Sequence, residues 1–360
     1  MSALQKGCFM SVTIRDVAEH CGFSIATISR ALSNSPTVKA ETREKIIAAS
    51  EELGYKYAPH VRKESKAAPV ITLVVGDIMN LFYLGIIKGI NDCLNENDIK
   101  LAIYNSDYDP AREEEFVRYA NEQKSDGIIM ITATETSGLV SLLKTVKCPV
   151  VLANRYIRSM DLDAVCIDNY RGGYMAGSYL AEHGHRRIAH LAGPANSTAS
   201  QDRERGFLDA MEDHHIELQE NMIYYGNLKR DSGAEFAEYF LSELADCTAV
   251  FSANDLMAAA FCEKLLAAGR RVPDDVSVIC FDDSTAAVSG DVKLTTISRD
   301  PYPMGRAAAE MMVEALKGVE SRHRKILFPP VLSVRDSVAA LATEQSEYME
   351  KTSSKYGRKG

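Results

Sequence analysis

The stretch GFSIATISRAL, residues 22–32, decides the N-terminal fold because it has the pattern of a short amphipathic helix. At 100° per residue its side chains divide between two opposite arcs. The arc expected to pack inward holds Thr27, Ile28, Ala31 and Leu32. The opposite arc holds Ile25, Ala26, Ser29, Arg30 and Ser33. The outer arc therefore combines short side chains with one cation, which leaves a protruding face that fits a nucleic-acid groove.

Two further helices are predicted, one on each side of this stretch. Upstream, Thr13 and Asp16 have the spacing of a capping box. Gly22 ends that helix because glycine enters the left-handed region freely, and Ser24 caps the next helix. A third helix is expected over residues 40–53. Its expected inward side chains are Ile46, Ile47 and Leu53.

Two short helices joined at a glycine-containing turn favour a helix-turn-helix DNA-binding unit. The guanidinium of Arg30 can donate to guanine O6 and N7, and Ile25 and Ala26 can contact a thymine methyl group. The alternative is a small helical bundle in which Arg30 is merely solvated. The charge pattern favours DNA binding, because the chain carries -9 overall while residues 1–66 have more Lys and Arg than Asp and Glu.

The composition excludes several classes of protein. With 360 residues, 46% hydrophobic and 25% charged, the chain has the makeup of a soluble globular protein of two or three domains. No apolar run approaches the roughly 18 residues of a membrane span, and the N-terminus has no secretory signal pattern. The eight cysteines contain no CxxC pair, so neither a disulfide framework nor a zinc site is expected. We therefore expect a cytoplasmic protein that has no membrane partner.

From residue 70 onward, short β-rich runs alternate with helical segments. The runs are VITLVV, KLAIYN, GIIMIT, PVVLANR, AVCIDN, RIAHLAG, MIYYGN, AVFSAN, SVICFDD and LTTISRD. Apolar strands that alternate with helices predict parallel sheets covered on both faces. Because these strands are too many for one small doubly wound sheet, we predict an α/β body of two lobes that switch near residues 157–168.

Polar side chains follow many of these runs. Ligands of such folds bind beyond the carboxyl ends of the strands, or between domains. The polar residues at strand ends are Asp77, Asn80, Asn154, Arg155, Asp168, Asn169, Asn254, Asp255, Asp282 and Asp283. Any one of them can equally be a turn or a helix cap. Several together indicate a cleft for a hydroxyl-rich or otherwise polar small ligand.

The run TIRDVAEHCGFSIATISRALSNSPTVKAETREKIIAASEELGY, residues 13–55, resembles the headpiece of the LacI/GalR (lac repressor-like) family of bacterial transcription regulators. The resemblance implies that Ile25, Ala26 and Arg30 contact bases. It implies contacts to the DNA backbone from Thr13, Ser24, Thr27, Ser29 and Asn34. Since the family begins just before its TI, Met10 is a candidate start, with residues 1–9 as an upstream extension.

The resemblance continues through the body, roughly over residues 12–337. It is carried by VVGDIMNLFYLGIIKGI, CPVVLANR, CIDNYRGG, HGHRRIAHLAGPANSTASQDRERGF, VFSANDLMAAA and RVPDDVSVICFDDS. It implies a two-lobed, periplasmic-binding-protein-like sensor core made of two doubly wound parallel sheets. The implied effector-binding residues are Phe82, Tyr83, Asn154, Arg203, Asn254 and Asp282. Arg203 can hold a carboxylate, phosphate or hydroxyl group, and Asn254 and Asp282 can clamp vicinal hydroxyls. The alternatives are a surface ion pair for Arg203 and a helix cap for Asp282.

The sequence departs from the family pattern at three places. The linker KYAPHVRKESKAAP, residues 56–69, lacks the Leu that family members wedge into the minor groove. Either Val61 is a weaker wedge or the hinge works without one. Lys39 replaces the usual capping Ser, which removes a cap but adds a charge directed at phosphates. Leu228 stands near the position where sugar-binding members place an aromatic ring, so the ring on which a sugar would stack is missing there.

We expect a headpiece over residues 12–56, a hinge linker over 57–69, a ligand-binding and dimerisation domain over 70–338, and a mobile tail over 339–360. The expected function is that of a ligand-responsive transcription regulator, a repressor, with a sugar or related metabolite as effector. A homodimer on a palindromic operator is expected because one headpiece makes few base contacts. No cofactor is expected. Whether the effector releases or recruits DNA binding stays open.

Two other functions were weighed. A periplasmic solute receptor would share the two-lobed body, but the headpiece and the missing signal argue against it. An enzyme is disfavoured because GxGxxG, GxxxxGK[ST] and GxSxG are absent. His183, His185 and His190 are too loosely spaced for a metal site and are expected to be structural.

Overall fold

The computed structural model describes residues 12–33, 35, 37–55, 68–319 and 323–341. Asn34, Val61, the linker up to residue 67, the tail from residue 342 and both candidate starts lie outside the described residues. The chain forms two units, one up to Ala67 and one from Ala68. Within the described residues, no helix is long and apolar enough to cross a membrane.

The headpiece contains the three predicted helices, α1 (Ile14–Cys21), α2 (Ile25–Leu32) and α3 (Ala40–Glu52). Thr13 begins α1 and donates to Asp16 Oδ2 from its backbone nitrogen at 2.6 Å and from its hydroxyl at 2.8 Å. Gly22 ends α1 at a φ of 71°, and the Ser24 hydroxyl caps α2 by accepting from the Thr27 nitrogen at 3.2 Å.

The core of the headpiece is a small apolar cluster. Its buried members are Val17, Ile28, Ala31 and Ile46. The prediction that Ile47 also points inward is wrong, because its side chain is 39% exposed. Ile46 and Ala49 face the cluster from α3, and Ile47 lies about 100° away from Ile46 on the helix.

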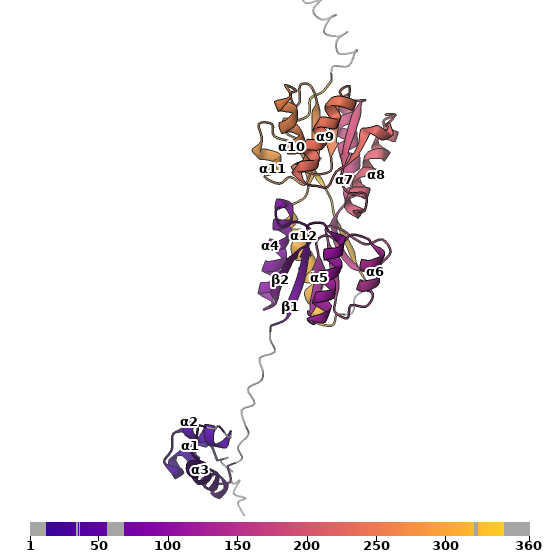
Figure 1. Cartoon of the computed structure of the whole chain (residues 1–360). Helices are drawn as coiled ribbons and strands as arrows, with labels where there is room; N and C mark the ends of the chain where they lie inside the picture. Colours follow the sequence, from indigo (N-terminus) through magenta and orange to yellow (C-terminus); the bar gives the residue numbers. More distant parts are fainter. Residues whose placement is uncertain (1–11, 34, 36, 56–67, 320–322, 342–360) are drawn as a thin grey trace, which may run out of the picture. The chain divides into compact units, whose positions relative to one another are not determined.

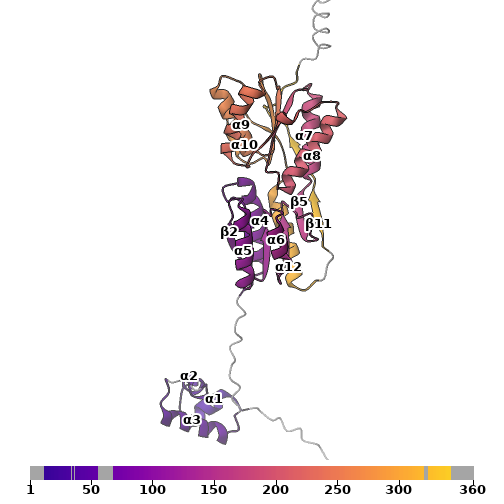
Figure 2. The same cartoon turned by 45° about the vertical axis from the view of Figure 1, so that its right-hand side comes forward.

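The body consists of two six-stranded sheets, each in its own lobe (Figures 1 and 2). The first lobe has strand order β11-β5-β4-β3-β1-β2, and all its pairings are parallel. Its elements are β1 (Val70–Val75), α4 (Leu81–Glu96), β2 (Lys100–Asn105), α5 (Pro110–Glu122), β3 (Gly127–Met130), α6 (Ser137–Leu143), β4 (Val150–Ala153), β5 (Asp163–Ile167), α12 (Pro301–Leu316) and β11 (Lys325–Phe328). Helices α4 and α12 pack against each other, as do α5 and α6.

The second lobe has strand order β12-β10-β9-β8-β6-β7, and only β12 is antiparallel to its neighbour within this sheet. Its elements are α7 (Asn169–Glu182), β6 (Ile188–Ala192), α8 (Thr198–Asp213), η1 (Glu220–Met222), β7 (Ile223–Tyr225), α9 (Arg230–Glu243), β8 (Ala249–Ser252), α10 (Asp255–Ala267), β9 (Ser277–Phe281), α11 (Ala286–Ser289), β10 (Thr295–Ser298) and β12 (Val331–Ser333). Helices α7 and α8 form one close pair, and α9 and α10 form another.

The predicted fold class is confirmed, with one correction to the topology. The chain first passes from one lobe to the other at Asp168, within the predicted range. It then returns to the first lobe between β10 and α12, and crosses again between β11 and β12, which the sequence did not predict. In Figure 1 the yellow-orange α12 accordingly lies within the indigo-to-magenta first lobe. Three connections therefore join the lobes.

Candidate functional site

Polar residues at the carboxyl ends of both sheets meet in a cavity between the lobes. The lining residues are Asn80, Tyr83, Asn154, Arg155, Ser197, Ala199, Ser200, Arg203, Leu228, Asn254 and Asp282. Five of the six residues predicted to bind an effector are among them. Phe82, the sixth, is buried in the first lobe and lines a neighbouring groove instead. The free volume of the cavity is about 10 Å³, roughly the room for one water molecule.

Arg203 extends from α8 to the centre of this cavity and is fully committed to protein groups. Its Nε donates to Asn169 Oδ1 at 2.8 Å, and its two Nη atoms donate to the Ala253 carbonyl and, at 3.3 Å, to Asp282 Oδ1. The guanidinium also lies 3.7 Å from the centre of the Phe281 ring. Burial lowers the pKa of Arg203, and the charge of Asp282 opposes that shift. The surface ion pair considered as the alternative is therefore excluded, because Arg203 is only 5% exposed.

Three residues that line the cavity have left-handed backbone. The φ values are 69° for Asn154, 66° for Leu228 and 96° for Asp282. Such values are costly for residues other than glycine and concentrate at functional sites. Asp282 follows β9 directly and receives the Arg203 guanidinium, so the helix-cap alternative does not describe it. Burial raises the pKa of Asp282, while Arg203 acts in the opposite direction.

Asn254 lies in the cavity, but its side chain already has partners. Its Oδ1 caps α10 by accepting from the Met257 nitrogen at 3.0 Å. Its Nδ2 donates to the Leu228 carbonyl at 2.8 Å. Asn254 therefore holds the strained Leu228 loop in place, and a clamp on ligand hydroxyls would require it to give up one of these bonds.

On the side of the first lobe, the lining residues Asn80 and Tyr83 lie close to Tyr108. The hydroxyl groups of Tyr83 and Tyr108 lie 3.5 Å apart, and Asn80 Nδ2 lies 3.5 Å from the Tyr108 hydroxyl. Burial raises the pKa of both tyrosines, so both are neutral donors at neutral pH. Tyr108 was missed in the sequence because it lies in the β2–α5 loop, away from the polar residues that end strands.

Other lining residues were also missed as effector contacts. Arg155 and Asn80 were among the polar strand ends that predicted a cleft, but not among the six residues predicted to bind the effector. Ser197 and Ser200 belong to the segment ANSTAS that precedes Arg203, and Ser197 caps α8. The run of small hydroxyl residues ahead of an Arg was the only available sign of this loop.

Two of the three histidines that were considered as metal ligands, His185 and His190, contact protein groups. His185 pairs with Thr248 Oγ1 at 2.9 Å and with the Ala339 carbonyl at 3.1 Å. His190 stacks on Phe251 with ring centroids 4.7 Å apart, and burial lowers its pKa to about 4. No group of three or more His, Cys, Asp or Glu side chains in the described ranges has the geometry to hold a metal ion.

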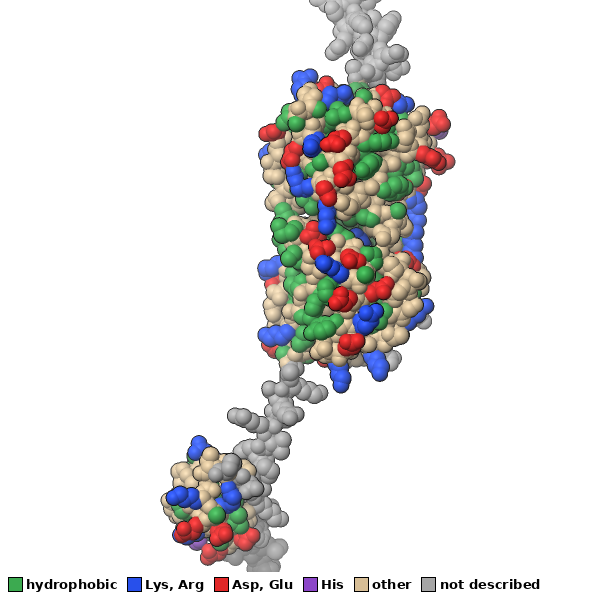
Figure 3. All heavy atoms as spheres, viewed as in Figure 1, with side chains coloured by type: hydrophobic (Ala, Val, Ile, Leu, Met, Phe, Trp, Pro, Cys, Tyr) green, Lys and Arg blue, Asp and Glu red, His purple; other side chains and the backbone are tan. Residues whose placement is uncertain are grey.

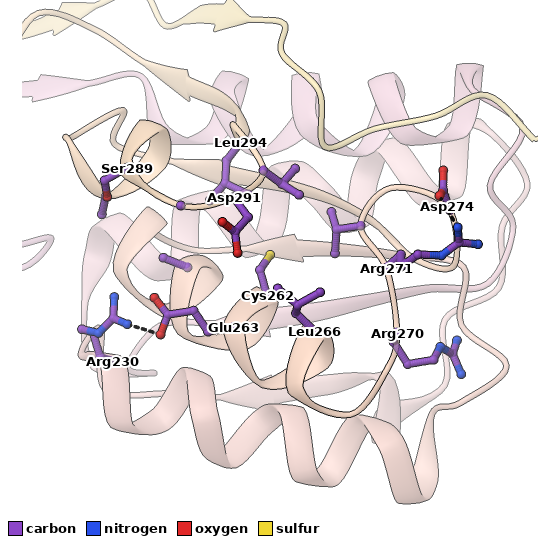
Figure 4. Close-up of a pocket in the computed structure, with 15 residues that line it drawn as sticks. Arg230, Cys262, Glu263, Leu266, Arg270, Arg271, Asp274, Ser289, Asp291 and Leu294 are labelled. Atoms are coloured by element: carbon purple, nitrogen blue, oxygen red, sulfur yellow. Dashed lines mark hydrogen bonds and ion pairs between the residues drawn. The ribbon is translucent and has the colours of Figure 1, made fainter.

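A second cavity, of about 260 Å³, lies on the second lobe alone between α10 and the α11–β10 segment (Figure 4). Arg230 and Glu263 form an ion pair at one side of it, and Cys262 and Leu266 line its centre. None of the predicted site residues reaches this cavity. It also lies away from the strand ends, where ligands of α/β folds bind.

The predicted DNA-contact residues that are described lie on α2 or at the starts of the three headpiece helices. Ile25, Ala26 and Arg30 are exposed, and Ile25 keeps 44% of its surface accessible. Thr13, Ser24 and Lys39 are exposed at helix starts, and Thr27 and Ser29 are partly buried. Lys39 makes no side-chain cap for α3. In the view of Figure 3, Lys and Arg side chains lie in the upper and middle part of this unit and acidic ones along its lower edge.

Comparison with known proteins agrees with this geometry. Residues 13–57 match the model of the bacterial regulatory proteins of the lacI family, and residues 178–338 match that of a periplasmic binding protein-like domain. The HTH-type transcriptional regulator DegA of Bacillus subtilis is 32% identical over 338 residues, which cover 93% of this chain and all of DegA. The chain belongs to the LacI family.

Solved structures of LacI-family regulators share the fold. The transcriptional regulator CelR–cellobiose complex is 31% identical, with a TM-score of 0.70 over 91% of this chain and 99% of that one. A LacI family regulator from Enterococcus faecium with bound ribose is 26% identical, with a TM-score of 0.67 over 76% of this chain and 100% of that one. The interpretation of the chain as a helix-turn-helix transcriptional regulator, and not an enzyme, is confirmed.

Proposed function

We propose that this LacI-family regulator is a cytoplasmic repressor whose affinity for its operator is set by a small polar effector bound between the lobes. The observation that supports this most strongly is the enclosed polar cavity, to which both lobes contribute. Arg155 and Tyr83 come from the first lobe, and Arg203 and Asp282 from the second. A ligand held by both lobes changes their relative angle only if it binds one arrangement better than the other.

The proposed DNA contacts follow from the exposed face of α2. Ile25, Ala26 and Arg30 contact base edges in the major groove. The proposed phosphate and sugar contacts are Thr13, Ser24, Thr27, Ser29, Asn34 and Lys39. Val61 in the linker is either a weak minor-groove wedge or takes no part. Because one headpiece covers few bases, two headpieces on a palindrome are needed for specificity.

A homodimer fits an exposed apolar patch at the start of α4. The helix buries Tyr83 against its own lobe. The residues left accessible just before and in its first turn are Ile78, Met79, Leu81 and Leu84, at 46%, 76%, 41% and 45% exposure. Neighbouring apolar side chains of this size mark interaction sites on soluble proteins.

The effector is proposed to be a sugar or related metabolite. The support is the polar lining of the cavity and the cellobiose and ribose held by two of the related regulators. Because most of the side chains that line the cavity are polar or charged, we expect recognition mainly by hydrogen bonds and charge.

The deciding experiment is a selection of duplexes from a random pool by the full-length protein, with and without an extract of small metabolites. We expect an enriched palindrome with evenly spaced half-sites. Enrichment only without the extract indicates release by the effector, and enrichment only with it indicates a co-repressor. Absence of any enriched sequence in both arms would overturn the proposed function.

A further inference from the structure

Two buried arginines line the cavity, and they differ in one respect. Arg203 has three hydrogen-bonding partners and an ion pair with Asp282. Arg155, at the end of β4, is 3% exposed, yet its guanidinium has neither a hydrogen bond nor an ion pair with any described residue. Its nearest described aromatic partner is the Tyr108 ring, 5.8 Å away. Arg203 is therefore built into the protein, and Arg155 is the available cation.

Two acidic groups lie near Arg155 and neither is hydrogen-bonded to it, although Glu113 Oε1 is itself buried without a hydrogen-bond partner among the described residues. Asp282 accepts from Arg203. Glu113, on α5, accepts from the Thr134 nitrogen at 2.8 Å through Oε2. Burial raises the pKa of Glu113, while Arg155 and the Thr134 bond oppose that rise. The interaction with Glu113 is thus through space only, and it leaves the buried Nε of Arg155 without an acceptor among the described residues.

A second polar group at the same edge is also unpartnered. Asn154, the neighbour of Arg155 in sequence, is 5% exposed, and its Oδ1 has no partner among the described residues. A buried charge or polar group without partners is costly, so proteins keep such groups where a ligand completes them. The side chains that line this cavity include two guanidinium groups and a single carboxylate. The lining therefore has an excess of positive charge.

We propose that Arg155 receives an anionic oxygen group of the effector, so the effector is an acidic sugar derivative, carrying a carboxylate or a phosphate, and not a neutral sugar. This proposal rests on the effector role assigned to the cavity above. The planar guanidinium suits either anion because it can donate two parallel hydrogen bonds. Arg203 then positions Asp282 and Asn169 for the rest of the ligand.

The first test compares the two arginines by thermal unfolding of the full-length protein. Arg155→Met removes a buried charge that has no hydrogen-bond partner among the described residues while keeping the apolar stem, so we expect a midpoint higher by about 2–4 °C. Arg203→Met leaves Asn169, Asp282 and the Ala253 carbonyl without their hydrogen-bond donor, so it should lower the unfolding midpoint. Arg118→Met removes a charge from an exposed position of the first lobe and serves as the control. If Arg155→Met destabilises like Arg203→Met, Arg155 is a structural residue and the proposal fails.

The second test uses simple anions and matched sugars as probes. Inorganic phosphate and acetate are compared with chloride at equal ionic strength, and galactose and ribose with galacturonate and ribose 5-phosphate. We expect at least one anionic probe to raise the unfolding midpoint of the wild type and to bind Arg155→Met at least tenfold more weakly. The response to acetate and galacturonate, or to phosphate and ribose 5-phosphate, tells a carboxylate site from a phosphate site.

Equal responses of the wild type and Arg155→Met to every anionic probe would overturn the proposal, as would tighter binding of the neutral sugars. These readouts are independent of DNA. Failure of the duplex selection therefore overturns the proposed regulatory function. The role of Arg155 is decided separately, by whether the unfolding midpoint rises in Arg155→Met and falls in Arg203→Met.

Discussion

Tyr156 in the first lobe donates a hydrogen bond of 2.8 Å from its hydroxyl group to Asp202 Oδ2 in the second lobe. Arg158 donates to the other oxygen of Asp202 at 2.9 Å. The hydroxyl of Thr198 adds a bond to the Tyr156 carbonyl at 2.9 Å. Because α8 also contributes Arg203 to the cavity, these contacts hold the lobes together directly beside the candidate site.

Tyr156→Phe should loosen this junction. A hydrogen bond to a charged group contributes about 1.5–3 kcal/mol to stability. Because Tyr156 is partly exposed, we expect the loss of stability in Tyr156→Phe to lie near the lower end of this range. Faster hydrogen exchange at the amide of Tyr156, which donates to Thr198 at 3.3 Å, would report the change. Tyr225→Phe is the matched control, since its hydroxyl donates to Glu204 within one lobe. Equal exchange at that amide in both variants would argue against a junction role.

Arg30→Ala should weaken operator binding and relax the choice of base at one position in each half-site. The loss expected for a contact to two guanine acceptors is about 1–3 kcal/mol. Binding to a panel of single-base operator variants measures it. Lys45→Ala on α3 removes a similar exposed charge, which pairs with Glu41 at 3.0 Å, and should leave the base preference intact. A uniform loss on every duplex would reduce Arg30 to a phosphate contact.

The sequence predicted most of the fold because its strands are apolar and separated by clear helical segments. All ten β-rich runs became β1 to β10. The strands β11 and β12 were missed because KILF and VLS are short, and most of their side chains are exposed or half-buried. The return to the first lobe depends on α12 packing against α4, which is a tertiary contact that no local pattern encodes.

Part of the site was predicted because the strands, and therefore the residues at their ends, could be recognised in the sequence. Polar residues at strand ends identify Asn154 and Asp282, because parallel strands bring their carboxyl ends to one edge. The positions of strand ends do not show whether Arg155 or Arg203 already has hydrogen-bond acceptors within the protein. It depends on where Asn169, Asp282 and the Ala253 carbonyl lie around Arg203, so the sequence favoured Arg203 and passed over Arg155.

Asp255 should make the stability of the sensor core depend on pH. Burial, with the charge of Asp282 adding to it, raises the pKa of Asp255 to about 7. The folded protein thus binds this proton more tightly than the unfolded chain does. The contribution of Asp255 to stability falls as the pH rises from about 4 to about 7, and is lowest above that range. Between these limits the change is at most about 4 kcal/mol.

Asp255→Asn tests this dependence because an amide oxygen can still accept from the Ser284 nitrogen. The variant should unfold at a higher temperature than the wild type above pH 7. The difference should shrink as the pH is lowered toward 5. A difference that does not change with pH would mean that Asp255 does not titrate in this range.

Gly206→Ala should separate the helices that position the central arginine. A Cβ atom at Gly206 would lie 1.9 Å from the Tyr170 carbonyl oxygen, so α8 would have to move away from α7. Arg203 and Asn169, joined at 2.8 Å, lie on these two helices within a turn of the contact. Overpacking of this kind costs about 1–3 kcal/mol.

We expect Gly206→Ala to lower the unfolding midpoint and to uncouple DNA binding from the effector, as measured by operator titrations with and without the metabolite extract. Gly290→Ala is the control. A Cβ atom there meets nothing closer than 3.7 Å, and its φ of -79° suits any residue. A response to the extract that survives in Gly206→Ala, with a lowered midpoint, would show that the effector acts without the close contact of α7 and α8.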